Sequence, residues 1–347
     1  MIPIQNIYYM LSYAFQVLKE QEYKKIATED FDNVAELCSA ILVKGMSVQI
    51  KRGLGREYIQ KTEPLSTLRG RIEMSESIRS RSMLRKQMVC SYDDFSVNSY
   101  MNRIIKTTML LPLRSDISKS RKKDLRKILV YLSEVEELDV YTIDWNQQYN
   151  RNNQTYQMLI SVCYLVIKGL LQTNSDGTTK MMDFLDVQRM SRLYEKFILE
   201  YYRKEFPQLN ASASQIPWGV DDGFRTMLPI MQSDITLSHG ENTLIIDAKY
   251  YSRTTQSQYD VHTLHSNNLY QIFTYVKNKE VELAAKPHTI SGMLLYAQTD
   301  EEVQPNNIYH MSGNKITVRT LDLNQYFSNI TDQLDQIVRE HFSLPFS

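Results

Sequence analysis

Helical spacing of apolar residues dominates the first part of the chain. Apolar positions recur every three or four residues in four segments, 4–20, 32–46, 98–113 and 118–132. Between the second and third segments, residues 48–60 show strand character, and a polar segment that contains Pro64 spans 61–70. This part of the chain is therefore expected to be rich in helices.

The second part alternates helices with short strands. Helices are expected over 154–171, 187–201, 266–277 and 324–342, and strands over 235–237, 243–246, 290–296 and 316–323. A polar run at 149–153 separates the two parts. We therefore predict two domains, residues 1–150 and residues 151–347. The helix over 154–171 either bridges them or begins the second domain.

Two aspartates flank a predicted β-hairpin in the second domain. The hairpin has a polar loop, and a turn centred between Gly240 and Glu241 places Asp234 directly across from Asp247, because both lie equally far from that centre. Opposed residues of an antiparallel pair share one sheet face, with Cβ atoms roughly 5 Å apart. The two-residue period of a strand then adds Lys249 to the same face as Asp247.

Two carboxylates and one ammonium group at this spacing suggest metal-assisted chemistry. Ionised carboxylates about 5 Å apart repel by roughly 3 kcal/mol at an effective dielectric constant near 20. Lys249 offsets part of this repulsion, and Mg²⁺, which prefers oxygen ligands, offsets more. Such an ion polarises a phosphoryl oxygen, and the ammonium group orients the attacking water or neutralises the transition state. The simpler alternative is a surface hairpin with an Asp-Lys ion pair.

The flanking helices offer further polar groups. Glu195 and Glu200 both flank the apolar stripe of the helix over 187–201, and periodicity does not choose between them as a third carboxylate ligand. A solvated helix edge is the simpler interpretation of each. In the helix over 266–277, which is expected to begin at a Ser or Asn cap, Gln271 and Tyr275 are four residues apart and share a face. There they would contact a DNA backbone or support the lysine, unless Tyr275 merely packs and Gln271 is exposed. In the helix over 187–201, the apolar stripe mentioned above consists of Met190, Leu193, Tyr194, Phe197, Ile198 and Tyr201.

This order of elements resembles the PD-(D/E)xK nuclease superfamily, in its RecB-like branch. A helix with Glu precedes Asp234, the run Asp247-Ala-Lys249 follows thirteen residues later, and a helix with Gln271-x-x-x-Tyr275 comes next. The proline that usually precedes the first Asp is replaced by Ser233.

The chain as a whole is similar to the McrC family, the nuclease subunits of modified-cytosine restriction systems. The segments that carry this resemblance are IPIQNIYYMLSYA at 2–14, LRGRIE at 68–73, NRIIK at 102–106, DAKYY at 247–251 and NLYQ at 268–271. The resemblance implies an α+β or α/β protein. Its helical-rich N-terminal domain would dock on a ring of McrB, an AAA+ GTPase. The C-terminal domain would have a restriction-endonuclease-like fold, with a central mixed sheet flanked by helices.

The resemblance also implies an activity. The chain would be a Mg²⁺-dependent endonuclease subunit that cleaves double-stranded DNA containing modified (methylated) cytosine and stimulates the partner's GTPase. Asp234, Asp247 and Lys249 would be catalytic, with Gln271 and Tyr275 in support. The ligands of Mg²⁺ would be Asp234, Asp247, the Ala248 carbonyl and, as a weaker candidate, Glu195. Two alternatives stay open, namely a stand-alone RecB-like DNA nuclease and a non-enzymatic GTPase-activating regulator. The intact Asp/Asp/Lys set argues against the regulator.

The zero formal net charge of the chain hides an asymmetry. Residues 51–127 contain 19 Lys and Arg against 8 Asp and Glu, a net charge of +11, so the remainder carries −11. A basic first domain suits an approach to DNA or to an acidic partner. The densest run, 121–127, also fits the solvated face of a helix whose apolar side is Leu125, Ile128, Leu129 and Leu132.

Arg69 and Arg71 stand on either side of Gly70 in this basic half. Arginine is suited to bidentate contact with carboxylate or phosphate groups. Alone, the segment is more simply a loop with two solvated arginines. The resemblance instead predicts that Arg69 or Arg71 helps to order the catalytic site of the partner GTPase.

Other features of the sequence indicate the cellular compartment of the protein and whether the chain itself binds a nucleotide. Three widely spaced cysteines, Cys38, Cys90 and Cys163, form neither a CxxC site nor a disulfide framework, which favours a reduced, cytoplasmic protein. The start of the chain lacks the basic and apolar regions of a secretory signal. No G-x-x-x-x-G-K-[ST] motif is present, and the run Gly53-Leu-Gly55 is too short to be one. GTP is therefore expected to bind the partner and not this chain.

Overall fold

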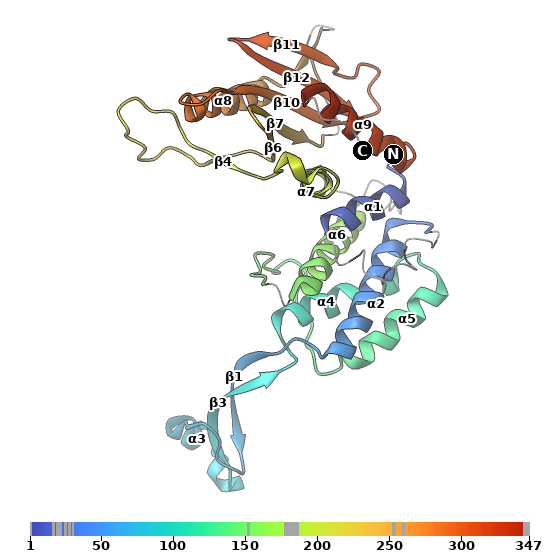
Figure 1. The fold of residues 1–347 in the computed structure, drawn as a ribbon. Coiled ribbons are helices and arrows are strands. Elements are labelled where there is room, and N and C mark those ends of the chain that lie inside the picture. Colours follow the sequence, from blue (N-terminus) through green and yellow to red (C-terminus); the bar gives the residue numbers. More distant parts are fainter. Residues whose placement is uncertain are drawn as a thin grey trace. The chain divides into compact units, whose positions relative to one another are not determined.

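The computed structural model describes residues 2–15, 18, 23, 26, 29, 31–150, 153–176, 187–251, 255–258 and 261–342. The chain forms two compact units (Figure 1). Residues 21–184 form one, here called the helical unit, and residues 1–20 together with 185–347 form the other, the sheet unit.

The helical unit is built on four main helices. These are α2 (Val34–Arg52), α4 (Tyr100–Leu110), α5 (Lys119–Tyr131) and α6 (Gln154–Asp176), with the short helix η5 (Pro112–Arg114) between α4 and α5. Helix α2 packs against the other three main helices, and α4 also packs against α5 and α6. Apolar residues at helical spacing fill the core between them, among them Ile41, Ile104, Leu125 and Leu159, all with 0% exposure.

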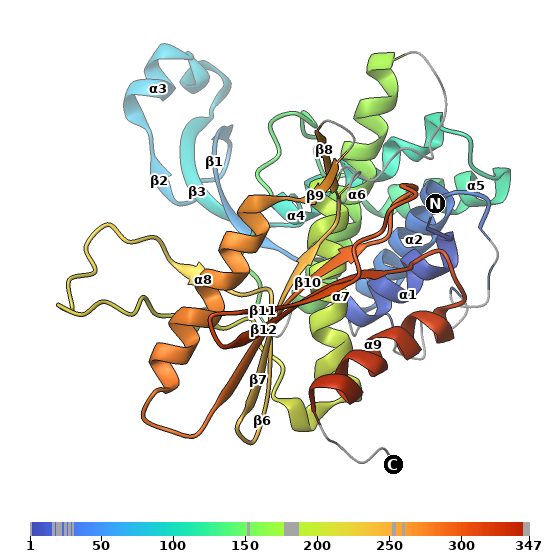
Figure 2. The ribbon, with the colours of Figure 1, turned by 90° about the horizontal axis from the view of Figure 1, so that it is seen from above.

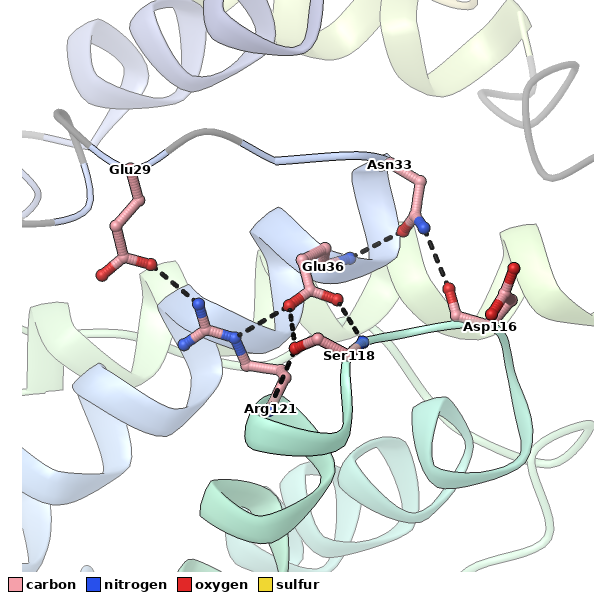
Figure 3. A network of polar contacts seen from close by, with 6 residues as sticks. All are labelled: Glu29, Asn33, Glu36, Asp116, Ser118 and Arg121. Carbon is pink, nitrogen blue, oxygen red and sulfur yellow. Dashed lines mark hydrogen bonds and ion pairs between the residues drawn. The ribbon is translucent and has the colours of Figure 1, made fainter.

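A polar network ties the start of α5 to the start of α2 (Figure 3). Glu36 is buried, and its carboxylate accepts hydrogen bonds from Ser118 N at 2.9 Å and from Ser118 Oγ at 2.7 Å. Arg121 Nη2 lies 2.7 Å from Glu29 Oε2. Asn33 caps α2 by accepting from Glu36 N and also donates to the Asp116 carbonyl. The buried carboxylate is therefore satisfied within the unit, as burial of a charge requires.

Residues 56–96, here called the arm, extend from these helices as a small sheet (Figure 1). Its elements are β1 (Glu57–Leu65), β2 (Arg71–Ile72), α3 (Met74–Arg79), η4 (Ser82–Arg85) and β3 (Met88–Ser96). The strand order is β1-β3-β2, and both pairs are antiparallel. The β1–β3 ladder runs without interruption from Glu57↔Ser96 to Leu65↔Met88.

The arm corrects two expectations about strands. The strand predicted over 48–60 is wrong in its first part, because α2 continues to Arg52 and β1 begins only at Glu57. The segment predicted to be polar over 61–70 is strand as far as Leu65 and includes Pro64. A proline is tolerated there because β1 is an edge strand of the arm.

The sheet unit contains a five-stranded mixed sheet of order β11-β12-β10-β7-β6. Its strands are β6 (Ile235–His239), β7 (Asn242–Lys249), β10 (Thr289–Ala297), β11 (Asn307–Met311) and β12 (Asn314–Leu321). The three central strands are parallel, and both outer strands pair antiparallel. The unit also contains two separate two-stranded sheets. One pairs β4 (Gln215–Ile216) with β5 (Met231–Gln232), and the other pairs β8 (Thr255–Gln258) with β9 (Val261–Leu264). The predicted mixed sheet is confirmed, although β11 was not expected.

Helices cover both faces of this sheet (Figure 2). Helix α8 (Ser266–Leu283) packs on one face, and α7 (Val187–Glu205) and α9 (Phe327–His341) lie on the other, with η7 (Pro207–Leu209) after α7. On the α8 face, Ile272 and Val276 pack with Ile245 and Leu294. A Cβ at Gly292 would lie 2.9 Å from both helix side chains, so glycine lets α8 approach β10 closely. Helix α8 begins at Ser266 with His265 in the cap position, so the predicted Ser or Asn cap is wrong.

The structure divides the chain differently from the predicted boundary between residues 150 and 151. Helix α1 (Ile4–Ala14) belongs to the sheet unit, where it packs against α7, and Asn6 Nδ2 donates to the carbonyls of Leu323 and Gln325 at 2.9 and 2.7 Å. Helix α6 belongs to the helical unit, where it completes the core of α2 and α4. Helix α1 ends at Ala14 and Phe15 is extended, so the helix predicted over 4–20 does not continue through Phe15, and residues 16, 17, 19 and 20 lie outside the described residues. Within the described ranges, no helix has the length and apolar character needed to cross a membrane.

Candidate active site

The β6–β7 hairpin has the register expected from its sequence. Ile235 pairs with Ile246 and His239 with Asn242, so the turn is Gly240-Glu241, and Gly240 has a φ of 57°. One step beyond the Ile235–Ile246 pair, the same register sets Asp234 against Asp247. Side chains two residues apart on a strand point to the same face. Asp247 and Lys249 therefore lie on the same face of β7 as Ile245, which α8 covers.

Asp247 is fully buried, with 0% exposure. Its Oδ1 lies 2.8 Å from Lys249 Nζ, yet neither carboxylate oxygen accepts a hydrogen bond of good geometry from any residue that the structure describes. Burial raises the pKa of Asp247 to about 7 in spite of Lys249, and the charge of Asp234 adds to the rise. Beyond this ion pair, the buried carboxylate oxygens have acceptor capacity that the described residues leave unused.

Asp234 is held by the backbone of the strand opposite. Its Oδ2 accepts a hydrogen bond from Ala248 N at 2.9 Å. Burial raises its pKa, against the opposing effect of Lys249. The N–H and C=O of one strand residue point to the same side, so the Ala248 carbonyl also points toward the side of Asp234. Two carboxylates and one carbonyl are thus available at the end of this hairpin.

Lys249 links the aspartates to α8. Its side chain is only 15% exposed, and Nζ lies 2.8 Å from Asp247 Oδ1 and 3.4 Å from Gln271 Oε1. Gln271 Nε2 in turn donates to Tyr275 Oη at 2.8 Å. Burial works against the charge of Lys249, but the aspartates outweigh it and raise the pKa of Lys249. The structure therefore brings together Asp247, Lys249, Gln271 and Tyr275 in one chain of contacts.

Glu195 and Glu200 have different surroundings on α7. Burial raises the pKa of Glu195, and so does the charge of Asp234. Ser191 Oγ donates to Glu195 Oε1 at 2.8 Å. Glu200 instead forms an ion pair with Arg203 at 2.6 Å. Among the described residues, no group of three or more His, Cys, Asp and Glu side chains lies close enough to hold a metal ion. Glu195 therefore feels the charge of Asp234, whereas Glu200 is paired with Arg203, and the role of Glu195 as a ligand stays a prediction.

A second layer around the site was not singled out from the sequence. Tyr296 lies beside Lys249 in the parallel ladder, and Asn268 Nδ2 donates to Tyr296 Oη at 3.0 Å. Tyr251 Oη donates to Asn268 Oδ1 at 3.3 Å. Burial raises the pKa of Tyr296 to about 12, so its hydroxyl stays protonated at neutral pH. The buried strand at 290–296 was predicted, but only its register with β7 places Tyr296 at the site.

Arg69 and Arg71 both lie in the arm, but the Arg69 side chain has more contacts than that of Arg71. The Arg69 guanidinium lies 4.1 Å from the centre of the Tyr92 ring and 3.7 Å from Asp94 Oδ1. The Arg71 side chain is 82% exposed, with Nε 3.3 Å from Glu73. Gly70 between them has a φ of 66°, and a Cβ there would lie 2.4 Å from the Ser91 carbonyl oxygen. Glycine is thus required for the turn that presents the two arginines.

Comparison with known proteins identifies the family. Residues 5–297 match the model of the McrBC 5-methylcytosine restriction system component, and the chain belongs to that family, which confirms the resemblance drawn from its motifs. A curated relative, the type IV methyl-directed restriction enzyme EcoKMcrBC of Escherichia coli K12, is 29% identical over 346 residues, covering 98% of each chain.

Two solved structures are also similar. One is a half-complex from the tetradecameric assembly of Thermococcus gammatolerans McrB AAA+ hexamers with bound McrC, with 17% identity and a TM-score of 0.49, covering 96% of this chain and 76% of that one. The other is the Thermococcus gammatolerans McrBC complex, with 19% identity and a TM-score of 0.42, covering 58% of each chain. At these TM-scores the likeness adds nothing to the family assignment.

Proposed function

We propose that this chain is the DNA endonuclease subunit of a GTP-dependent restriction complex that cleaves double-stranded DNA containing modified (methylated) cytosine. Membership of the McrBC family and a relative named as a methyl-directed restriction enzyme support the substrate class. The observation that carries the proposal is the fully buried Asp247 carboxylate, which faces Asp234 across the hairpin and has only the Lys249 ammonium group as a close partner of opposite charge among the described residues.

The donor set at this position fits Mg²⁺. Asp234 and Asp247 would hold the ion, with the Ala248 carbonyl as a further oxygen ligand and Glu195 as a weaker candidate. Oxygen ligands of this kind are those that Mg²⁺ prefers, and the ion would remove the cost of burying two adjacent carboxylates. When bound, Mg²⁺ supplies Lewis acidity toward the scissile phosphate.

Lys249 acts in this proposal as a hydrogen-bond donor. Because the aspartates raise its pKa, the ammonium group stays protonated at neutral pH and is unsuited to act as a base. It would orient the attacking water and stabilise the negative charge that develops on the phosphate. The amide of Gln271 faces the ammonium group and is itself held by Tyr275, so α8 would fix the direction in which Lys249 donates.

The partner in this proposal is a McrB-like AAA+ hexamer that binds and hydrolyses GTP. The arm has the surface that such docking needs, because it exposes apolar side chains beside arginines and lysines. Its large exposed apolar residues are Tyr58, Leu68, Ile72, Met74, Ile78, Met83, Leu84 and Phe95. Arg71 is the better candidate for contact with the GTPase site, because Arg69 is already engaged with Tyr92 and Asp94.

A cleavage assay with separate omissions tests the proposal. Duplex DNA with methylated or unmodified cytosine is incubated with the chain, the partner, GTP and Mg²⁺, leaving out one component at a time. We expect cleavage of the methylated duplex only when all components are present. Cleavage without partner and GTP would instead support a stand-alone nuclease. GTPase stimulation without any cleavage would support a non-enzymatic regulator.

A further inference from the structure

A buried polar cluster holds both ends of the arm where it leaves the helices. Asn102 of α4 is 0% exposed, and its Nδ2 donates to the carbonyl of Gly55 at 2.9 Å and to that of Val97 at 2.8 Å. Gly55 immediately precedes the arm, and Val97 immediately follows it. One amide group therefore joins the outgoing and returning strands.

Tyr156 of α6 completes the cluster. Its hydroxyl accepts from Gly55 N at 2.8 Å and donates to Asn102 Oδ1 at 2.7 Å. The phenol is 5% exposed, so the bonds are shielded from water. Every polar hydrogen and carbonyl oxygen of the Asn102 amide is used, and a fully satisfied buried network of this kind is rigid. Asn102, Tyr156 and the backbone at Gly55 and Val97 are called the clamp below.

The glycines next to the arm fit this arrangement. A Cβ at Gly55 would lie 3.0 Å from Tyr156 Oη, so the absence of a side chain lets the backbone reach the phenol. Gly53, at the end of α2, has a φ of 99° and turns the chain toward the clamp. The Gly53-Leu-Gly55 run, which is too short for a nucleotide-binding loop, therefore serves to connect α2 to the arm: Gly53 makes the turn, and Gly55 makes room for the phenol of Tyr156.

Because the arm is long, the clamp at its base controls where the far end of the arm lies. At about 3.3 Å per residue, a nine-residue ladder is about 30 Å long, and the β1–β3 ladder has nine pairs. A rotation of about 10° at its base would move the far end by roughly 5 Å, more than the reach of a hydrogen bond. Contacts at the base must therefore be stiff if side chains along the arm are to meet a partner in a defined place.

We propose that Asn102 and Tyr156 are positioning residues that set the direction of the arm and so deliver Arg71 to the partner GTPase. The proposal rests on the proposed function for its partner. The direction of the arm itself is a property of this chain alone and can be measured without the partner.

The test uses Tyr156→Phe, with Tyr100→Phe as its matched control. Tyr100 Oη accepts from Asp144 N at 2.8 Å, so each variant removes a tyrosine hydroxyl from a hydrogen bond in the helical unit, and only Tyr156→Phe opens the clamp. Spin labels at Leu84→Cys in the arm and Val130→Cys in α5, which are 81% and 71% exposed in the native chain, report the direction of the arm. The native cysteines Cys38, Cys90 and Cys163 are buried.

We expect a narrow distance distribution for the wild type and Tyr100→Phe, and a broad or shifted one for Tyr156→Phe. GTP hydrolysis stimulated by Tyr156→Phe should fall at least about tenfold, since misplacement by ångströms is costly in a catalytic site. Gly55→Ala keeps every hydrogen-bonding group but crowds the phenol, so it should broaden the distribution even if Tyr156→Phe folds poorly.

Two results would overturn the proposal. One is an unchanged distance distribution in both clamp variants, and the other is normal stimulation by a variant whose distribution is broad. A wild-type chain that fails to stimulate the partner would overturn the proposed function instead. The distance distributions would then still decide whether the clamp sets the arm.

Discussion

The Asp234 carboxylate accepts a hydrogen bond from the backbone N–H of Ala248, the residue between Asp247 and Lys249. The strand that carries two of the candidate catalytic residues therefore fixes the side chain of the third. This bond does not involve the Asp247 carboxylate, which is left with Lys249 as its only close cation among the described residues.

The stability of the metal-free protein should fall as pH rises. Burial raises the pKa of Asp247 from 3.8 to about 7, so between these values the folded state binds more protons than the unfolded state. The free energy of unfolding then decreases with increasing pH across this window. The pKa values of Asp234 and Glu195 are also raised and act in the same direction. Thermal melting in a chelator from pH 5 to pH 8 measures the slope.

Asp247→Asn supplies the control for this pH dependence. The variant lacks the titrating group, so it should melt at a higher temperature than the wild type at pH 8 and show a shallower slope. Mg²⁺ should raise the melting temperature of the wild type more than that of the variant, because it binds the folded carboxylates. Identical slopes in the two proteins would contradict the burial of a charged Asp247.

Lys249→Ala should slow DNA cleavage by about 10²- to 10³-fold, because one donor to the developing charge is lost. Mg²⁺ binding, measured by calorimetry, should be largely retained, since Lys249 is not a ligand. Lys279→Ala is the matched control, because Lys279 is also a lysine of the sheet unit but pairs with Glu282 on α8 at 3.0 Å. Equal cleavage rates in the two variants would remove Lys249 from the mechanism.

Glu195→Gln and Glu200→Gln should behave differently. Glu195 lies near Asp234, so loss of its charge should weaken Mg²⁺ binding and slow cleavage by about 10- to 100-fold, the range seen for groups that support metal ligands. Glu200 pairs with Arg203 at the helix surface, and such pairs contribute at most about 1 kcal/mol to stability. Titration of cleavage rate against Mg²⁺ concentration separates the two. A larger effect from Glu200→Gln would contradict the assignment.

Arg71→Ala should lower partner-stimulated GTP hydrolysis without changing the melting temperature, because its side chain is 82% exposed. Arg69→Ala should also loosen the arm, because Arg69 stacks on Tyr92 and pairs with Asp94. Replacing both should lower GTP hydrolysis and, with it, DNA cleavage. Normal stimulation by the double variant would instead favour DNA contact by the basic half of the chain.

The hairpin could be predicted from the sequence because it is local. Its register depends only on where the turn lies, and the polar loop around Gly240 is enough to place Asp234 opposite Asp247. The burial of Asp247 is less local, because it depends on α8 and β10, which lie further along the chain. For the same reason the helix pattern could not separate Glu195 from Glu200. Both border the apolar stripe of α7, and only tertiary packing decides that Glu195 is buried and feels the charge of Asp234.

Unit membership could not be predicted because it depends on long-range contacts. The pattern of α1 resembles that of the helices that follow it, but its partners are α7 and the carbonyls of Leu323 and Gln325. Likewise, the boundary between α2 and β1 was misplaced because residues 48–52 suit either a helix or a strand. In the structure they form the last turns of α2, which ends at Arg52 and is followed by Gly53 in the cap position.

The measurement that tests the central claim most directly is DNA cleavage by Asp247→Ala in the complete reaction, with GTP hydrolysis followed in the same tube. The account predicts that cleavage of methylated duplex DNA is abolished, while partner binding and stimulated GTP hydrolysis stay at wild-type levels, and that Asp234→Ala behaves in the same way. Cleavage by Asp247→Ala at the wild-type rate would show that the active site lies elsewhere.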